Sequence, residues 1–322
     1  MEFVRPKIVI SKCLGFAACY YSGQIFNIEF IDKLGEFVEF KPVCPELEIG
    51  LGVPRPTIRI VKDKEEIRLI QPKTKEDLTK KMNDFSEKFL NKFDYIDGFI
   101  FKSRSPSCGF KDIKVYPSLN GMVINKEGVG LFAKKAMNLY PKAVVESEGR
   151  LNNLRLREHF LSKLYTLAEF RTIENNKSMQ DLVKYHTRHK YLFMAYNQNI
   201  LNELGNITAN HANKKEQEVY SLYEKKLQEI LLKPPTYKSI INVLSHIYGY
   251  FKNKLSKNEK KFFIDIVEKY RDNKVNLAVP IHLLRAWIIE YDVSYLKEQS
   301  FINPFPKELV DLTDSGKNND RL

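Results

Sequence analysis

The chain has 322 residues, 43% of them hydrophobic and 29% charged, and a formal net charge of +12. This composition predicts a globular protein long enough for two domains, and the positive charge favours an anionic partner such as nucleic acid, although a biased genome composition produces the same charge. No run of about 18 apolar residues is present and the first residues lack a signal-peptide pattern, so we expect a cytoplasmic protein with no membrane partner.

The first 150 residues alternate short β-branched or aromatic runs with longer amphipathic stretches. This alternation is typical of a mainly parallel sheet with crossover helices, and it predicts a Rossmann-like α/β domain over residues 1–150. The predicted strands are 7–11, 37–43, 95–101 and 143–145, and the predicted helices are 75–92 and 128–139. Residues 57–70 differ, because two β-rich runs there flank a charged turn, which predicts a pair of adjacent strands.

From residue 151 onward the pattern is helical throughout. Helices are predicted at 151–171, 178–204, 213–232, 237–255, 258–271 and 279–291, with breaks at Pro234-Pro235 and Asn273. We therefore expect an all-α C-terminal domain over residues 173–322, joined to the first domain by a connecting helix at 151–172.

Four cysteines lie in the first third of the chain, whereas all six histidines lie at or beyond His159. The cytoplasm keeps thiols reduced, so metal binding or reactivity is favoured over structural disulfides. Cys13, Cys44 and Cys108 each follow a predicted strand by a few residues and lie close to Gly or Pro. Ligands bind outside the carboxyl ends of parallel strands in open α/β sheets, so these three thiols are predicted to meet at one site.

Three thiolates select a soft metal centre. They fit either a tetrahedral zinc or an iron-sulfur cubane with one open iron, and an open iron would bind and polarise a thiocarbonyl sulfur. Buried apolar thiols, a disulfide or a cysteine nucleophile are the alternatives, although this domain has no histidine to activate a thiol. Cys19, six residues after Cys13, is interpreted as a packing residue, with a fourth ligand or sulfur carrier as the alternative.

Polar residues beside two of these thiols are candidates for catalysis. Glu46, two residues after Cys44, is the candidate general base for activating water, and an exposed solvated carboxylate is the alternative of equal weight. Ser105, three residues before Cys108, is a candidate hydrogen-bond donor, although a serine before proline is also an ordinary turn residue. The same loop region supplies three candidate substrate-binding residues, Lys102, Ser103 and Ser107.

Three sequence blocks resemble the thiouracil desulfidase family over residues 5–148. The blocks are Ser11-Lys12-Cys13-Leu14-Gly15 with its continuation to Gly23, Cys44-Pro45-Glu46, and Ser105-Pro106-Ser107-Cys108-Gly109. The resemblance implies that Cys13, Cys44 and Cys108 bind a 4Fe-4S cluster whose fourth iron takes the sulfur of the substrate. It also implies that Glu46 and Ser105 assist hydrolysis. Tyr21-Ser22 departs from the family pattern, in which an acidic residue commonly precedes the glycine.

The second half contains a run from His186 to Ala195 that is similar to the helical domain often fused behind such desulfidases. Fused proteins of this kind are associated with 4-thiouridine in tRNA, so the resemblance implies tRNA as a partner. Four residues of this run are predicted to contact RNA phosphates: His186, Arg188, His189 and Lys190. Histidines that cap a helix or pack in a core are the alternative.

These features together predict an iron-sulfur-dependent, non-redox desulfidase, in which hydrolytic cleavage of a C–S bond removes sulfur from 4-thiouridine in tRNA and releases sulfide. The alternative substrate is free thiouracil or a thionucleoside. A non-catalytic RNA-binding or redox-sensing iron-sulfur protein is the alternative from another class. The sequence makes no prediction about the oligomeric state.

Overall fold

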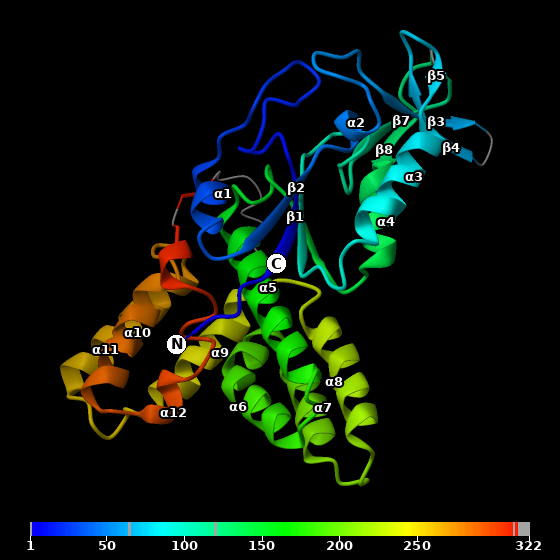
Figure 1. The fold of residues 1–322 in the computed structure, drawn as a ribbon. Helices are drawn as coiled ribbons and strands as arrows, with labels where there is room; N and C mark the ends of the chain where they lie inside the picture. The colour runs from blue at the N-terminus through cyan, green and yellow to red at the C-terminus, as the bar shows by residue number, and fades with distance from the viewer. Residues whose placement is uncertain (1, 64–65, 119–120, 312, 315–322) are drawn as a thin grey trace. The chain divides into compact units, whose positions relative to one another are not determined.

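The computed structural model describes residues 2–63, 66–118, 121–311 and 313–314, and its chain divides into two compact units (Figure 1). One unit contains Val4–Leu164 and the other contains Tyr165–Lys307. The boundary falls inside the long helix α5 (Leu154–Glu174), which covers most of the region predicted as a connecting helix. Among the described residues, no helix meets the length and hydropathy that crossing a bilayer requires.

A four-stranded parallel sheet forms the centre of the first unit. Its strands are β1 (Lys7–Ser11), β2 (Glu39–Val43), β6 (Gly98–Phe101) and β9 (Val144–Ser147), in the order β2-β1-β6-β9. Each neighbouring pair runs parallel, as the sequence predicted. The two central strands, β1 and β6, are short and rich in buried β-branched and aromatic side chains. All four residues of β6 are buried, which is typical of parallel strands covered on both faces.

Two amphipathic helices pack together in this unit, α3 (Thr79–Leu90) and α4 (Leu131–Leu139), which lie side by side in Figure 1. Phe85 and Phe89 of α3 contact Phe132 of α4 with ring centroids 6.4 and 6.0 Å apart. Phe132 also packs edge-on against Phe101 at the end of β6. This aromatic contact holds the start of α4 close to the end of the central strand, beside which the candidate site lies. Two short helices that the sequence did not predict follow β1 and β2: α1 (Glu29–Leu34) and α2 (Pro45–Glu48).

A second, five-stranded sheet lies in the same unit. Its order is β5 (Glu76–Asp77), β4 (Glu66–Gln71), β3 (Arg59–Asp63), β7 (Ile113–Tyr116) and β8 (Asn125–Gly128). The antiparallel pair β3–β4 confirms the strand pair predicted at 57–70. Strands β7 and β8 were not predicted, because they have four residues each and β8 reads Asn-Lys-Glu-Gly, without the apolar alternation that marks a strand.

The second unit is helical, which confirms the predicted all-α region. After the C-terminal part of α5, it contains α6 (Met179–Tyr196), α7 (Gln198–Ala209), α8 (Glu216–Ile230), α9 (Tyr237–Tyr248), α10 (Lys257–Arg271), α11 (Ala278–Glu290) and α12 (Ser294–Lys297). The 3-10 turn Lys307–Leu309 lies at the boundary, because Glu308 and Leu309 belong to the first unit. The prediction of a single helix over residues 178–204 was wrong, because the structure has two helices there. Asn197 interrupts it, because its extended backbone ends α6 while its side-chain oxygen accepts hydrogen bonds from Asn199 N and Ile200 N and caps α7.

Candidate active site

The ends of three adjacent parallel strands are joined by hydrogen bonds where the first two cysteine loops begin. Lys12 N donates to Val43 O at 2.8 Å, which extends the β1–β2 pairing, and Lys102 N donates to Ser11 Oγ at 2.9 Å, which ties β6 to β1. Cys13 follows β1 after a single residue, Lys12, and Cys44 follows β2 directly. The sheet order β2-β1-β6 therefore brings loops that are far apart in the sequence to one edge.

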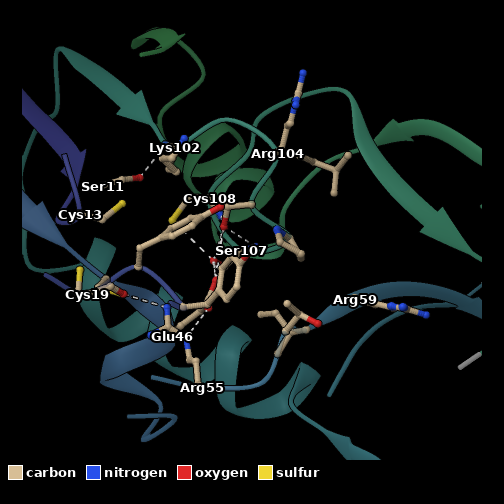
Figure 2. Close-up of a pocket in the computed structure, with 18 of the residues that line it drawn as sticks. Ser11, Cys13, Cys19, Glu46, Arg55, Arg59, Lys102, Arg104, Ser107 and Cys108 are labelled. Atoms are coloured by element: carbon tan, nitrogen blue, oxygen red, sulfur yellow. Dashed lines mark hydrogen bonds and ion pairs between the residues drawn. The ribbon is translucent and has the colours of Figure 1, made fainter. Parts of the chain in front are cut away.

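All four cysteines line one pocket of about 680 Å³ at this edge (Figure 2). Cys13, Cys19, Cys44 and Cys108 are buried and none forms a disulfide. Figure 2 shows the sulfurs of Cys13, Cys19 and Cys108 around one side of the pocket. Cys19, interpreted from the sequence as a packing residue, thus shares the cavity with the three predicted ligands.

The Cys108 loop is held by the start of α4. Leu131 N donates to Pro106 O at 3.2 Å and Ala133 N donates to Ser107 O at 3.1 Å. Gly130 allows this approach, because a Cβ at that position would lie 2.5 Å from Ser107 O and 3.0 Å from Cys108 N. The glycine is therefore required by the close contact of two backbones, and the loop geometry depends on it.

The surroundings of Cys19, Cys44 and Cys108 favour the protonated form of each thiol. A hydrogen bond with Cys13 raises the pKa of the Cys19 thiol to about 11. A hydrogen bond with Cys19, together with burial, raises the pKa of Cys44. Burial raises the pKa of Cys108 to about 12. A metal that binds these sulfurs must displace their protons, so metal binding at this site is coupled to proton release.

The donor set at the pocket fits a soft metal centre. Thiolate sulfur selects soft centres such as zinc and iron-sulfur clusters. Four thiols line one cavity here, the three predicted ligands and Cys19. In the described part of the chain, no three His, Cys, Asp or Glu side chains are grouped as the ligands of a single metal ion. The residues that would hold a cluster are Cys13, Cys44 and Cys108, with Cys19 adjacent.

Glu46 lines the pocket and lies next to Arg55 (Figure 2). It is 8% exposed, so the alternative of a solvated carboxylate was wrong. Its Oε2 accepts a hydrogen bond from Arg55 Nε at 2.7 Å, and its Oε1 accepts one from Ser107 Oγ at 2.6 Å. Ser105 Oγ is 3.5 Å from Oε1 and 2.9 Å from Ser107 Oγ. The carboxylate is therefore fixed by a guanidinium on one oxygen and by a pair of hydroxyls on the other.

The two serines have different surroundings. Ser105 Oγ accepts hydrogen bonds from Ser107 N at 3.3 Å and Cys108 N at 3.1 Å, so it closes the turn that carries Cys108. Ser107 Oγ makes the shorter contact with Glu46 and lies 3.7 Å from Cys108 Sγ. Both hydroxyls line the pocket, and Ser107 links the carboxylate to the thiol.

Lys102 lines the pocket, whereas Ser103, the third residue predicted to bind substrate, is not part of its lining. Glu148 accepts hydrogen bonds from Lys102 Nζ and from both Ser103 N and Ser103 Oγ. The Lys102 ammonium also lies 4.6 Å from the centroid of the Phe26 ring. The side chain of Ser103 is therefore engaged in holding Glu148, which in turn holds the Lys102 ammonium at the pocket.

The remaining rim of the pocket is basic and aromatic, a feature that the sequence did not predict. Figure 2 shows Arg59 and Arg104 on the side opposite the cysteine sulfurs. The Arg59 guanidinium lies 4.4 Å from the centroid of the Tyr116 ring. The other basic and aromatic side chains of the rim are Lys12, Lys114, Lys126, Tyr20 and Tyr21. These residues come from both sheets and several loops, so no run of the sequence contains them.

Arg55 was also missed, although it is the direct partner of Glu46. It lies between Pro54 and Pro56 and is 7% exposed. A single charged residue between two prolines, where the backbone is restricted, is the one signal in the sequence that points to it.

The predicted RNA contact of His189 in the helical unit needs correction. His189 is 2% exposed, with Nε2 3.1 Å from Glu169 Oε2 and Nδ1 2.8 Å from Ser300 Oγ. Both ring nitrogens are used inside the unit, so this side chain is a core residue and does not reach a phosphate. Arg188 pairs with Glu169 at 2.8 Å.

His186 is partly buried and Lys190 is exposed. Nδ1 of His186 lies 3.1 Å from the Tyr223 hydroxyl. Burial lowers the pKa of His186 to about 4, so this ring is neutral at pH 7 and carries no charge for a phosphate. Of the four predicted RNA-contact residues, Lys190 is the exposed cation that remains a candidate.

Comparison with known families assigns each unit separately. Residues 8–148 match the family model described as 2-thiouracil desulfurase, and residues 190–306 match one described as a protein of unknown function, DUF1722. A solved structure of the 4Fe-4S-dependent thiouracil desulfidase TudS is 25% identical, with a TM-score of 0.34, and covers 46% of this chain and 93% of that chain.

Two curated bacterial proteins are similar over about half of the chain. The uncharacterized protein YbgA of Escherichia coli (strain K12) is 24% identical over 168 residues, which are 52% of this chain and 99% of YbgA. The uncharacterized protein YbbK of Bacillus subtilis (strain 168) is 30% identical over 154 residues, which are 46% of this chain and 99% of YbbK. Through the unit that carries the four cysteines, the chain belongs to the 2-thiouracil desulfurase family, whose members cleave carbon–sulfur bonds.

Proposed function

We propose that this chain is an iron-sulfur-dependent, non-redox desulfidase that hydrolyses the thiocarbonyl of 4-thiouridine in tRNA and releases sulfide. The observation that carries the proposal is the meeting of four thiols with a buried, hydrogen-bonded carboxylate in one pocket. Thiols alone would suit a structural metal or a redox sensor. A carboxylate fixed beside them supplies the general base that hydrolysis requires.

In this proposal Cys13, Cys44 and Cys108 hold a 4Fe-4S cluster, which supplies a thiophilic Lewis acid that makes a thiocarbonyl carbon electrophilic. Glu46 Oε1 takes a proton from the attacking water. Water oxygen bonds to the ring carbon and the carbon–sulfur bond breaks. Both protons of the water leave with the sulfur, one of them by way of Glu46, so the products are a carbonyl and hydrogen sulfide and no electrons are exchanged. Ser107 donates the hydrogen bond that holds the carboxylate. Ser105 donates one to the oxygen that forms on the ring carbon.

The basic and aromatic rim supports a nucleotide within RNA as the substrate. Arginine and lysine side chains around a pocket contact phosphates without reading sequence, and aromatic rings stack on unpaired bases. The rim carries Arg59, Arg104, Lys114 and Lys126 beside three tyrosines. A base stacked in a folded RNA must be displaced before it can enter such a pocket, and the net charge of +12 favours the surrounding backbone.

Free thiouracil or a thionucleoside is a second candidate substrate, because the family model that matches residues 8–148 is described by thiouracil itself. A pocket of about 680 Å³ lies within the range of about 300–1,000 Å³ found for small-ligand sites. Comparison of kcat/KM for 4-thiouridine-containing tRNA, 4-thiouridine and free thiouracil separates the two candidates.

The test begins with anaerobic purification of the full chain and measurement of iron, acid-labile sulfide and visible absorption. Loss of the near-ultraviolet absorption of 4-thiouridine in tRNA is then followed, with Cys108→Ala as the control. We expect turnover by the wild type and none by the variant. A protein that carries a cluster and releases no sulfide from any thiolated pyrimidine would be an RNA-binding or redox-sensing protein instead.

A further inference from the structure

We infer that Arg55 is the positioning residue of this site, which orients Glu46 so that one carboxylate oxygen faces the serines and the pocket. The inference rests on the proposed function, since it assumes that Glu46 is the base. It adds a residue that lies outside the three sequence blocks and that bonds Glu46 Oε2, the carboxylate oxygen that is not assigned as the base.

Arg55 and Glu46 form a buried pair of defined geometry. Arg55 Nε donates to Glu46 Oε2 at 2.7 Å, and the side chains are 3% and 11% exposed. Ser107 Oγ donates to the other oxygen, Oε1, at 2.6 Å. A carboxylate held at both oxygens cannot rotate about its last bond without breaking a charge-assisted hydrogen bond in a buried site. Oε1 is therefore kept on the serine side of the pocket.

The other two nitrogens of the Arg55 guanidinium also donate hydrogen bonds. Nη1 donates to Gly52 O at 3.0 Å and Nη2 donates to Cys19 O at 3.1 Å. Nη2 also lies 3.9 Å from Cys44 Sγ. The guanidinium is thus anchored on two backbone carbonyls before it meets the carboxylate, and its direction does not depend on Glu46 alone.

No other side chain can reproduce this set of contacts. A guanidinium presents five N–H donors in a rigid planar fork, whereas an ammonium is a single point of charge on a flexible stem. Lysine at this position can keep the charge beside Glu46 but cannot hold Gly52 O and Cys19 O together with Oε2. The conservative substitution therefore separates positioning from charge.

The experiment combines Arg55→Met, Arg55→Lys and Glu46→Gln in the full chain, reconstituted anaerobically. With Glu46 present, Arg55→Met should lower kcat by roughly 100-fold with KM changed less than about threefold, because a misplaced base costs rate and leaves binding intact. In the Glu46→Gln background the same substitution should cost less than about threefold, because residues that act through one another are non-additive. Arg55→Lys should recover part of kcat.

Iron content and visible absorption are measured for every variant, because Arg55 also approaches Cys44. Values equal to those of the wild type are expected. The matched control is Arg68→Met, which breaks an exposed arginine–glutamate pair with Glu66 at 3.0 Å and should leave kcat and iron content unchanged. A loss of kcat that follows the loss of iron would contradict positioning, and so would an equal loss of kcat in both Glu46 backgrounds.

A second measurement does not depend on turnover. In the metal-free chain, the shifts in urea midpoint caused by Arg55→Met and Glu46→Gln should be strongly non-additive, because each substitution removes the same hydrogen-bonded pair. Additive shifts overturn the inference. If the shifts are non-additive but the chain never releases sulfide, the Arg55–Glu46 pair is supported and the proposed function is contradicted. The two failures are therefore distinguishable.

Discussion

At the residue scale, the site depends on which contacts each side chain makes, and the sequence predicted the residue types better than their contacts. Cys13, Cys44 and Cys108 were predictable because each follows a parallel strand, and strand ends meet at one edge. Glu46 was predictable from its place beside Cys44, but its burial was not, because burial depends on Arg55 from a later loop. His189 was misassigned because helical spacing does not tell a core face from an exposed one.

Ser107→Ala should lower kcat by roughly 10- to 100-fold while the iron content stays at the wild-type level. The physical reason is that Ser107 Oγ donates at 2.6 Å to the carboxylate oxygen that takes the proton, and a hydrogen bond to a charged group contributes about 1.5–3 kcal/mol. Steady-state kinetics normalised to iron measures this. Ser245→Ala is the matched control, because its exposed hydroxyl bonds Ile241 O in the helical unit and is not part of the pocket lining. Equal effects of the two substitutions would contradict the role of Ser107.

His186 should make the stability of the helical unit depend on pH. Burial lowers its pKa to about 4 in the folded chain, below the ordinary value of 6.5. Above pH 6.5 the His186 ring is neutral in both the folded and the unfolded chain, so the full free energy of unfolding is present. As the pH falls from about 6.5 to about 4, the unfolded chain gains the proton first, so the free energy of unfolding should fall by up to about 3 kcal/mol.

Urea unfolding curves recorded between pH 7.5 and 4 measure this dependence, with the circular dichroism of the helices as the signal. His186→Gln should flatten the pH dependence, whereas the exposed His246→Gln should leave it as in the wild type. An unchanged slope in His186→Gln would show that another group titrates.

At the element scale, patterns of period and turn residues predicted the parallel strands, the β3–β4 pair and most helices. They did not predict β7 and β8, because those strands are defined by pairing with β3 and with each other and carry charged, exposed residues. The break at Asn197 was missed because the residue belongs to an otherwise continuous helical pattern. Its side chain caps α7 only because its backbone is extended, and the sequence does not show that conformation.

Gly130→Ala should destabilise the first unit by about 1–3 kcal/mol and reduce iron retention. The added Cβ would lie 2.5 Å from Ser107 O, so either the Cys108 loop or the start of α4 must move. The urea midpoint of the metal-free chain and the iron content after gel filtration measure the two effects. Gly149→Ala is the control, since its Cβ would meet only Ser103 Oγ at an ordinary 3.8 Å. Iron retention equal to that of the control would contradict the dependence of the Cys108 loop on Gly130.

At the scale of the whole molecule, composition predicted two units and an anionic partner. The location of the basic side chains around the pocket could be seen only in the folded structure. The basic rim draws Arg59 from β3, Arg104 from the loop after β6 and Lys114 from β7, so it exists only once both sheets have formed. The run from His186 to Lys190 was selected instead because it is contiguous in the sequence.

The double substitution Lys114→Gln and Lys126→Gln should raise KM for tRNA and leave kcat/KM for free thiouracil unchanged. Both lysines are exposed on the pocket rim. The dependence of log(kcat/KM) on log salt should become less steep by about one for each phosphate that the chain no longer neutralises. Steady-state kinetics at several salt concentrations measures the slope, and the exposed Lys225→Gln, outside the pocket lining, is the control. A salt dependence unchanged by the double substitution would place the RNA elsewhere on the chain.

The most direct test of the central claim, hydrolytic removal of sulfur without electron transfer, is to run the reaction in water labelled with oxygen-18. The full chain, loaded with iron and sulfide, is given 4-thiouridine-containing tRNA without any reductant, and the nucleosides and free sulfide are quantified by mass spectrometry and colorimetry. We predict one labelled oxygen in uridine for each sulfide released, and neither product with Cys108→Ala. Sulfide release without labelled oxygen, or turnover only when an electron donor is supplied, would contradict this claim.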